Sequence, residues 1–126
     1  MISIDPSSAV DVFFEKSFWN EKSCRVLLEI AEKSNVEEAG VYRDGRLQVD
    51  PNLRKTRRIL LDQPLFAEIG NSLLSVKPRI EEHFQLTLQG LQGVQFLQYR
   101  AGDYFHTHAD EWEPPSDSTR KISIIL

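Results

Sequence analysis

The chain has 126 residues, of which 40% are hydrophobic and 27% charged, as expected for one globular domain with its own core. Its net charge of −4 gives no overall positive surface for nucleic acid or an anionic membrane. No apolar run reaches the roughly 18 residues that span a bilayer, and the first residues lack the pattern of a secretory signal. The only cysteine, Cys24, excludes an internal disulfide. We therefore expect a cytoplasmic domain without a nucleic-acid or membrane partner.

The first elements expected are a short strand and a helix. Residues 10–14 form a compact apolar run, which favours a strand. Asn20 can cap a helix over residues 21–33 with its side-chain oxygen. Apolar residues recur there at the spacing of one buried helical face, at Cys24, Leu27, Leu28 and Ala31. This spacing makes Cys24 a core residue rather than a nucleophile.

Residues 35–52 are polar and contain Gly40, Gly45 and Pro51, so we expect a turn-rich connection. The basic cluster at residues 54–58 is then expected to be a solvated turn, because the rest of the chain is acidic. It leads into a short apolar strand at residues 59–61.

A second helical region follows. Asp62 can cap a helix that begins near Pro64, since proline is tolerated in the first turn. Its apolar residues keep a helical period at Leu65, Ile69, Leu73 and Leu74. Pro78 should break or kink this helix before residues 80–84.

The second half of the chain alternates as strands do. Residues 86–89 and 94–99 predict two strands with turn residues between them, and residues 121–126 predict a last one. Helices followed by antiparallel strands indicate an α+β fold.

The segment most informative about chemistry is residues 98–110, Q-Y-R-A-G-D-Y-F-H-T-H-A-D. On a strand, His106, His108 and Asp110 would share one face. Imidazole nitrogen with carboxylate oxygen suits iron(II), manganese or zinc, and two histidines with one carboxylate form the facial set of non-haem iron(II) oxygenases. This segment therefore predicts two ligands of a divalent metal, His108 and Asp110.

A longer pattern surrounds these two ligands. It reads Y-x-x-G-x-x-[FY]-x-x-H-x-D from Tyr99 to Asp110, and R-x-x-S at Arg120 and Ser123 begins an apolar strand. The pattern resembles the prolyl-4-hydroxylase-like branch of the Fe(II)/2-oxoglutarate-dependent dioxygenases. The layout before it, with an early strand, a helix and an R-K-T turn at residues 54–56, is similar too.

The resemblance implies an iron- and 2-oxoglutarate-dependent hydroxylase that acts on an unactivated C–H bond of a prolyl or other amino-acid residue. His108 and Asp110 match the family's first histidine and its carboxylate, both iron ligands. Tyr99 matches a tyrosine that can bind 2-oxoglutarate, and Arg120 a position near the substrate mouth. Iron(II), 2-oxoglutarate and dioxygen are implied, with ascorbate as a further cofactor. The implied fold is a double-stranded β-helix, or jelly roll, with N-terminal helices packed outside.

The chain departs from the family at its end. Relatives supply a second iron-binding histidine and then a basic residue for 2-oxoglutarate, and neither His83 nor His106 matches that histidine. We therefore expect residues 1–126 to be the N-terminal portion of a single dioxygenase domain, truncated at the C-terminus. The apolar strand at residues 121–126 would then be an exposed edge that favours oligomerisation.

Other interpretations remain open. His106 could be a bystander, a ligand or a hydrogen-bonding partner within the strand. Read as H-x-H-x-D, the segment resembles a metallo-β-lactamase-like zinc hydrolase, although Glu111 stands where that family has a histidine. A non-catalytic interaction module on a truncated oxygenase fold is the alternative from another class.

Overall fold

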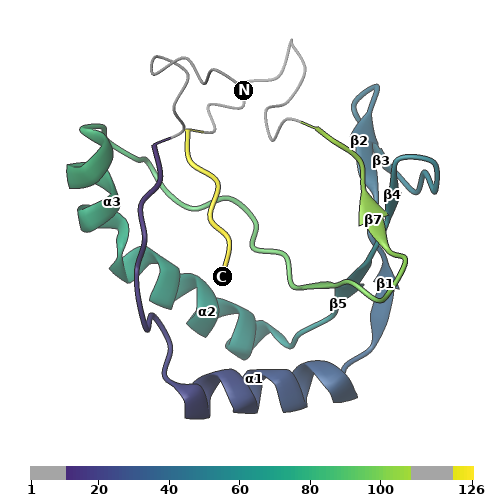
Figure 1. Cartoon of the computed structure of the whole chain (residues 1–126), viewed down its shortest axis with the longest axis horizontal. Coiled ribbons are helices and arrows are strands. Elements are labelled where there is room, and N and C mark those ends of the chain that lie inside the picture. The colour runs from purple at the N-terminus through teal and green to yellow at the C-terminus, as the bar shows by residue number, and fades with distance from the viewer. Residues whose placement is uncertain (1–10, 109–120) are drawn as a thin grey trace, which may run out of the picture.

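The fold is described from a computed structural model, in which residues 11–108 and 121–126 are described. This part contains three helices and seven short strands, and every strand pair is antiparallel. The helices run along the bottom and left of Figure 1, and the strands stand on the right. The α+β class expected from the sequence is confirmed. None of the described helices is long and apolar enough to cross a membrane.

The first helix, α1 (Glu21–Lys33), has the predicted bounds. The Asn20 side chain caps it by accepting a hydrogen bond from the backbone N–H of Ser23 at 2.8 Å. The predicted buried face is wrong, because Ala31 alone of its four residues is buried and Leu28 is 62% exposed. Cys24 is exposed as well, since the described chain leaves that side of the helix uncovered. It is therefore a surface residue and not the core residue that we predicted.

The second helix, α2 (Gln63–Ser75), begins where its cap was predicted. Asp62 accepts a hydrogen bond from the backbone N–H of Leu65 at 3.0 Å, and proline occupies the first turn. Helix α3 (Lys77–Phe84) follows after a break at Val76. The predicted break is confirmed, but Pro78 lies in the first turn of α3, where its missing N–H costs no helical hydrogen bond. This region supplies most of the buried apolar side chains: Ile69, Leu73, Val76 and Ile80.

The polar segment at residues 35–52 is more regular than predicted. It contains β1 (Val36–Glu38), β2 (Val41–Arg43) and β3 (Arg46–Gln48), and the last two form a hairpin. Asp44 and Gly45 both have positive φ, +52° and +71°, as a two-residue hairpin turn requires. The expectation of a turn-rich connection missed this Asp-Gly hairpin signal.

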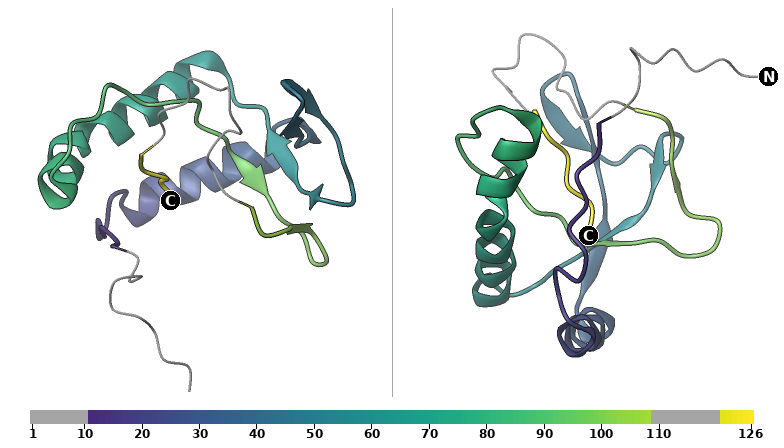
Figure 2. Two further views of the ribbon diagram at one scale, coloured as in Figure 1. Left: turned by 90° about the horizontal axis from the view of Figure 1, so that it is seen from above. Right: turned by 60° about the vertical axis from the view of Figure 1, so that its left-hand side comes forward.

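The basic cluster, predicted to be a solvated turn, is two strands. β4 (Arg54–Lys55) pairs with β7 (Tyr104–Phe105), whereas β5 (Arg57–Ile59) pairs with both β1 and β6 (Leu97–Gln98). The segment 54–59 therefore connects two separate sheets. Figure 2 shows the strands in two further views, gathered on the side away from α3. The strand predicted at residues 59–61 in fact ends at Ile59.

The other predicted strands are wrong or shortened. Of residues 94–99 only β6 is a strand, and residues 86–89, 11–14 and 121–126 contain none, while Val10 lies outside the described residues. A strand needs a neighbour to accept and donate its backbone hydrogen bonds. In the described chain residues 121–126 belong to none of the strand pairs, and Ile125 is 94% exposed. No described strand arrangement amounts to a jelly roll.

Replacing Asp62 by alanine should lower the free energy of unfolding by about 1 kcal/mol, because the N–H of Leu65 loses its side-chain acceptor. Urea denaturation followed by circular dichroism measures the change. The matched control is Gln63→Ala, one residue into the helix, which should have little effect. Equal losses for the two variants would show that the cap itself contributes nothing.

Candidate metal centre

Two of the four predicted site residues lie in the described part of the chain. Tyr99 follows β6 and His108 follows β7, whereas Asp110 and Arg120 lie outside the described residues. The strand expected to carry His106 and His108 ends at Phe105. One further hydrogen bond, from the His106 backbone N–H to the Leu53 carbonyl at 2.9 Å, extends the pairing by a residue. His108 is therefore positioned by side-chain contacts and not by a strand.

An aromatic stack holds the His108 ring. Its centroid lies 3.6 Å from that of Phe105, and the two planes are 17° apart. The Arg54 guanidinium carbon lies over the same Phe105 ring, 4.4 Å from its centroid. Arg54 and Phe105 face one another directly in the β4–β7 register, so the pairing of two strands brings the cation to the ring.

The buried guanidinium of Arg54 is itself fixed by hydrogen bonds. Arg54 as a whole residue is only 7% exposed. Nε donates to Thr56 Oγ1 at 2.8 Å, and one terminal nitrogen donates to the Gly40 carbonyl at 3.0 Å. No described carboxylate forms an ion pair with it. Burial lowers the pKa of Arg54, and the nearby Tyr99 acts in the opposite direction. Arg54 thus links the neighbourhoods of Tyr99 and His108.

A backbone carbonyl defines which nitrogen of His108 is protonated. Nδ1 lies 2.7 Å from the His106 carbonyl oxygen, which can only accept a hydrogen bond. In the neutral imidazole Nδ1 therefore carries the proton and Nε2 the lone pair. Metal-binding histidines commonly use one ring nitrogen as the ligand while the N–H of the other donates to a backbone carbonyl or carboxylate. The chemistry of His108 thus fits the ligand role predicted for it.

The turn between β6 and β7 is fixed by a buried carboxylate. Asp103, whose side chain is 2% exposed, accepts hydrogen bonds at 2.8 Å from the Arg100 backbone N–H and from the Arg57 guanidinium. The Lys55 ammonium is 3.9 Å away. The Arg100 N–H, ahead of Arg57 and Lys55, holds the pKa of this carboxyl below its ordinary value. Asp103 therefore ties the turn that precedes the histidines to β4 and β5.

The sequence alone did not indicate Arg54, Thr56 or Asp103 as parts of this region. In the structure Arg54 and Thr56, two residues apart in R-K-T-R-R, are both buried, but their polar side chains give no such pattern in the sequence itself. Period-two burial is the mark of a strand rather than of a solvated turn.

Within residues 11–108 and 121–126, no group of three histidine, cysteine or acidic side chains is placed to hold a metal. Of the predicted pair of ligands, His108 alone is described. His83 is engaged elsewhere, because its Nε2 lies 2.9 Å from Asp11 Oδ1. It belongs to α3, which Figure 1 shows on the opposite side of the molecule from β7.

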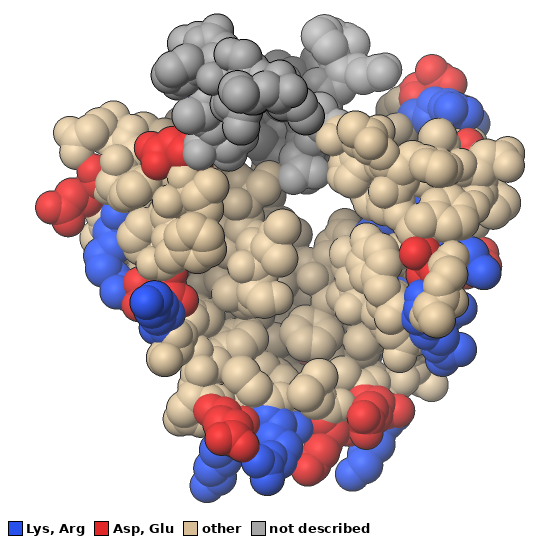
Figure 3. Space-filling view, viewed as in Figure 1, with Lys and Arg blue, Asp and Glu red and all other residues tan. Residues whose placement is uncertain are grey.

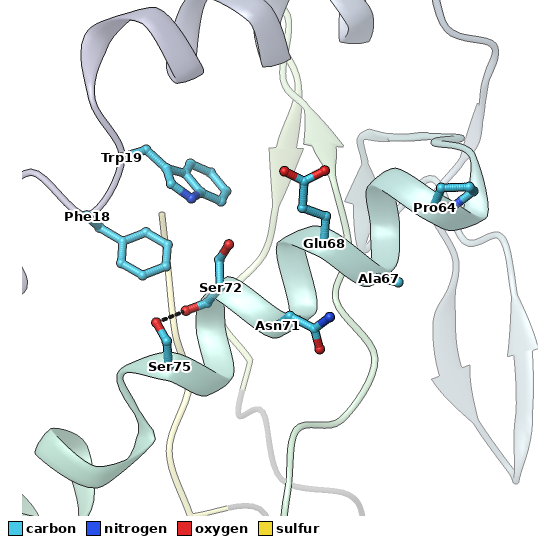
Figure 4. Close-up of a pocket in the computed structure, with 8 residues that line it drawn as sticks. All are labelled: Phe18, Trp19, Pro64, Ala67, Glu68, Asn71, Ser72 and Ser75. Atoms are coloured by element: carbon cyan, nitrogen blue, oxygen red, sulfur yellow. Dashed lines mark hydrogen bonds between the residues drawn. The ribbon is translucent and has the colours of Figure 1, made fainter.

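A separate groove of about 580 Å³ lies beside α2. Figure 4 shows Phe18 and Trp19, from the segment before α1, directed toward the α2 residues Glu68 and Ser72. Its single carboxylate and its lack of any histidine make it unlike a metal site. None of the predicted site residues lines it.

No protein-family model, curated protein or solved structure matches this chain.

The contribution of Asp103 should depend on pH. Because its pKa is lower in the folded chain than the ordinary value of about 3.9, the stability that it adds is fully present above that value. It should be lost as the pH falls through the lower folded pKa. The free energy of unfolding of wild type should therefore exceed that of Asp103→Asn at pH 7, and the difference should shrink below about pH 4.

Urea unfolding at several pH values measures this difference. Asp44→Asn, in the exposed hairpin turn, is the control for a lost acidic charge. A difference between wild type and Asp103→Asn that stays constant down to pH 2 would contradict the assignment.

Proposed function

We propose that this chain belongs to an iron(II)- and 2-oxoglutarate-dependent dioxygenase that hydroxylates an unactivated C–H bond. In this proposal His108 and Asp110 bind the iron. The observation that supports the proposal most strongly is the fixed orientation of His108. Its ring is stacked on Phe105, and its Nδ1 donates to the backbone carbonyl of His106. A surface histidine without a function needs neither constraint.

The surroundings of Tyr99 support its proposed contact with 2-oxoglutarate. Tyr99 is close enough to Arg54 to affect the pKa of the guanidinium, and Arg54 contacts the ring on which His108 stacks. A phenol near a buried cation suits a dianionic cosubstrate. Arg120 is proposed to lie at the substrate mouth, with a prolyl or other amino-acid residue as the substrate.

The strand pairing is compatible with the proposed jelly roll. Strands β4 and β5, which precede α2, pair with β7 and β6, which follow α3. Such pairing between distant segments, with helices outside the strands, is what a double-stranded β-helix with N-terminal helices needs. We propose that these short sheets form part of that barrel.

Bound iron(II) would supply the activation of dioxygen and the oxidation of 2-oxoglutarate that accompanies hydroxylation. The residues of this chain have other tasks. His108 presents a lone pair, Asp110 adds negative charge, and Tyr99 orients the cosubstrate. The third protein ligand and the basic residue for 2-oxoglutarate have no match among residues 1–126.

A second candidate function is a non-catalytic binding module. Several large apolar side chains are exposed in the described chain, among them Phe14 (81%), Leu28 and Ile125. Exposed apolar side chains mark an interaction site where they lie together in one patch. Under this proposal the protein would bind a partner, or a second copy through its C-terminal segment, and would produce no succinate from 2-oxoglutarate.

The ligand assignment predicts a clear order among three alanine variants. His108→Ala and Asp110→Ala should each abolish succinate formation from 2-oxoglutarate in the active enzyme, because each removes an iron ligand. His106→Ala should retain appreciable activity. Succinate measured under saturating iron(II) provides the comparison. If His106→Ala were inactive and His108→Ala active, the assignment would be wrong.

Tyr99→Phe should raise the KM for 2-oxoglutarate by roughly 10–100-fold, because a hydrogen bond to a charged group contributes about 1.5–3 kcal/mol. Retention of iron should change little. The matched control is Tyr104→Phe, which removes a hydroxyl that donates to the Pro51 carbonyl. An unchanged KM for 2-oxoglutarate in Tyr99→Phe would argue against the proposed contact.

A further inference from the structure

The buried cation beside Phe105 has a role that the proposed ligand set does not include. We propose that Arg54 is a positioning residue, which fixes the orientation of the His108 imidazole through the ring of Phe105. The part that concerns metal binding rests on the proposed function, whereas the orientation of the ring does not.

The guanidinium is held in one plane before it meets the aromatic ring. Its two hydrogen bonds go to Thr56, two residues along the same segment, and to the carbonyl of Gly40. These acceptors lie in separate parts of the chain, so they determine both the position and the tilt of the group. A lysine ammonium in the same place could not present a flat face.

The constraint passes from Arg54 to His108 by direct contact. The guanidinium carbon lies 4.4 Å from the centroid of Phe105, and the His108 centroid lies 3.6 Å from it. With its Nδ1 bound to the His106 carbonyl, the imidazole is limited in both plane and rotation. If Phe105 were free to change rotamer, the plane of His108 would no longer be defined.

The burial of Arg54 has a cost that an apolar side chain would avoid. Removing a guanidinium from water without a paired carboxylate is unfavourable, and no carboxylate in the described chain pairs with it. Methionine at this position could cover Phe105 at a lower cost of desolvation. What methionine lacks is the rigid, hydrogen-bonded plane, and this is the property that the proposal assigns to Arg54.

A purely structural role is the competing explanation, in which Arg54 only stabilises the β4–β7 pair. The two roles differ at the His108 ring. A structural role would alter stability and leave the imidazole of the folded protein unchanged. A positioning role would alter the environment of the imidazole in protein that is still folded.

The test uses proton–carbon NMR of the histidine rings and titration with Mn²⁺. The chain has three histidines, so replacing each by glutamine assigns the signals. The variants are Arg54→Met, Thr56→Val and Thr56→Ser, the last of which keeps a hydroxyl for Nε. Arg58→Met is the control, because Arg58 forms an exposed pair with Glu37 on the neighbouring β5–β1 pair of strands.

In Arg54→Met the His108 ring signals should move toward those of an unstacked histidine, because the upfield ring-current shift from Phe105 is lost. Mn²⁺ affinity should fall by roughly 10–100-fold, as expected when a group that orients a metal ligand is removed. Thr56→Val should give a smaller change in the same direction. Thr56→Ser and Arg58→Met should resemble wild type.

Unmoved His108 signals in folded Arg54→Met would overturn the proposal. If that variant does not fold, unmoved signals in Thr56→Val would overturn it, and so would equal shifts in Arg58→Met or Thr56→Ser. Absence of Mn²⁺ binding by wild type would count against the proposed function alone, because the ring signals still report the orientation.

Discussion

The contact between the Arg54 guanidinium and the Phe105 ring connects the strand pairing with the candidate metal centre. Arg54 begins the segment that pairs first with β7 and then, beyond Thr56, with β1 and β6. The contact therefore lies where two sheets diverge. Without it, β7 would be held to β4 by two residue pairs and one further hydrogen bond from His106. Such short pairs have little stability without side-chain contacts.

The basic residues that follow Arg54 in the chain form ion pairs near the Arg54–Phe105 contact. Arg57 and Lys55 neutralise the buried Asp103, and Arg58 pairs with Glu37, so the cations beside Arg54 have acidic partners. Figure 3 shows that the charged side chains of the visible face lie mainly toward its periphery, around a hollowed, largely uncharged centre. Arg54 differs from its neighbours because its described partners are a hydroxyl, a carbonyl and an aromatic ring. Among the four basic residues of the segment 54–58, Arg54 is thus the one without an acidic partner in the described chain.

The helices could be predicted from the sequence, because their signals are local. Asn20 and Asp62 each lie directly before a helix and bind a backbone N–H three residues on. Burial could not be predicted in the same way. The apolar face of α1 has the correct period, yet Leu28 is exposed, since periodicity states which residues share a face and not whether another element covers it.

The strands and the surroundings of the site could not be predicted from local sequence patterns, because they are formed by pairing between residues far apart in the chain. Arg54 meets Phe105 about fifty positions later in the chain, and no local pattern could have placed that cation over that ring. The basic cluster was therefore interpreted by its composition as a solvated turn. Tyr99 and His108 were selected from a motif, and the structure adds the residue that connects their surroundings.

The central proposal is that the stacked His108 is one of two metal ligands in this chain, and paramagnetic broadening by Mn²⁺ tests it most directly. At the lowest Mn²⁺ concentrations the NMR signals of His108 should broaden first, followed by those of Phe105 and Tyr99. The signals of His83, which is engaged with Asp11 on the helical side, should remain sharp. Broadening that begins at His83, or that spreads evenly over the acidic surface, would contradict the claim.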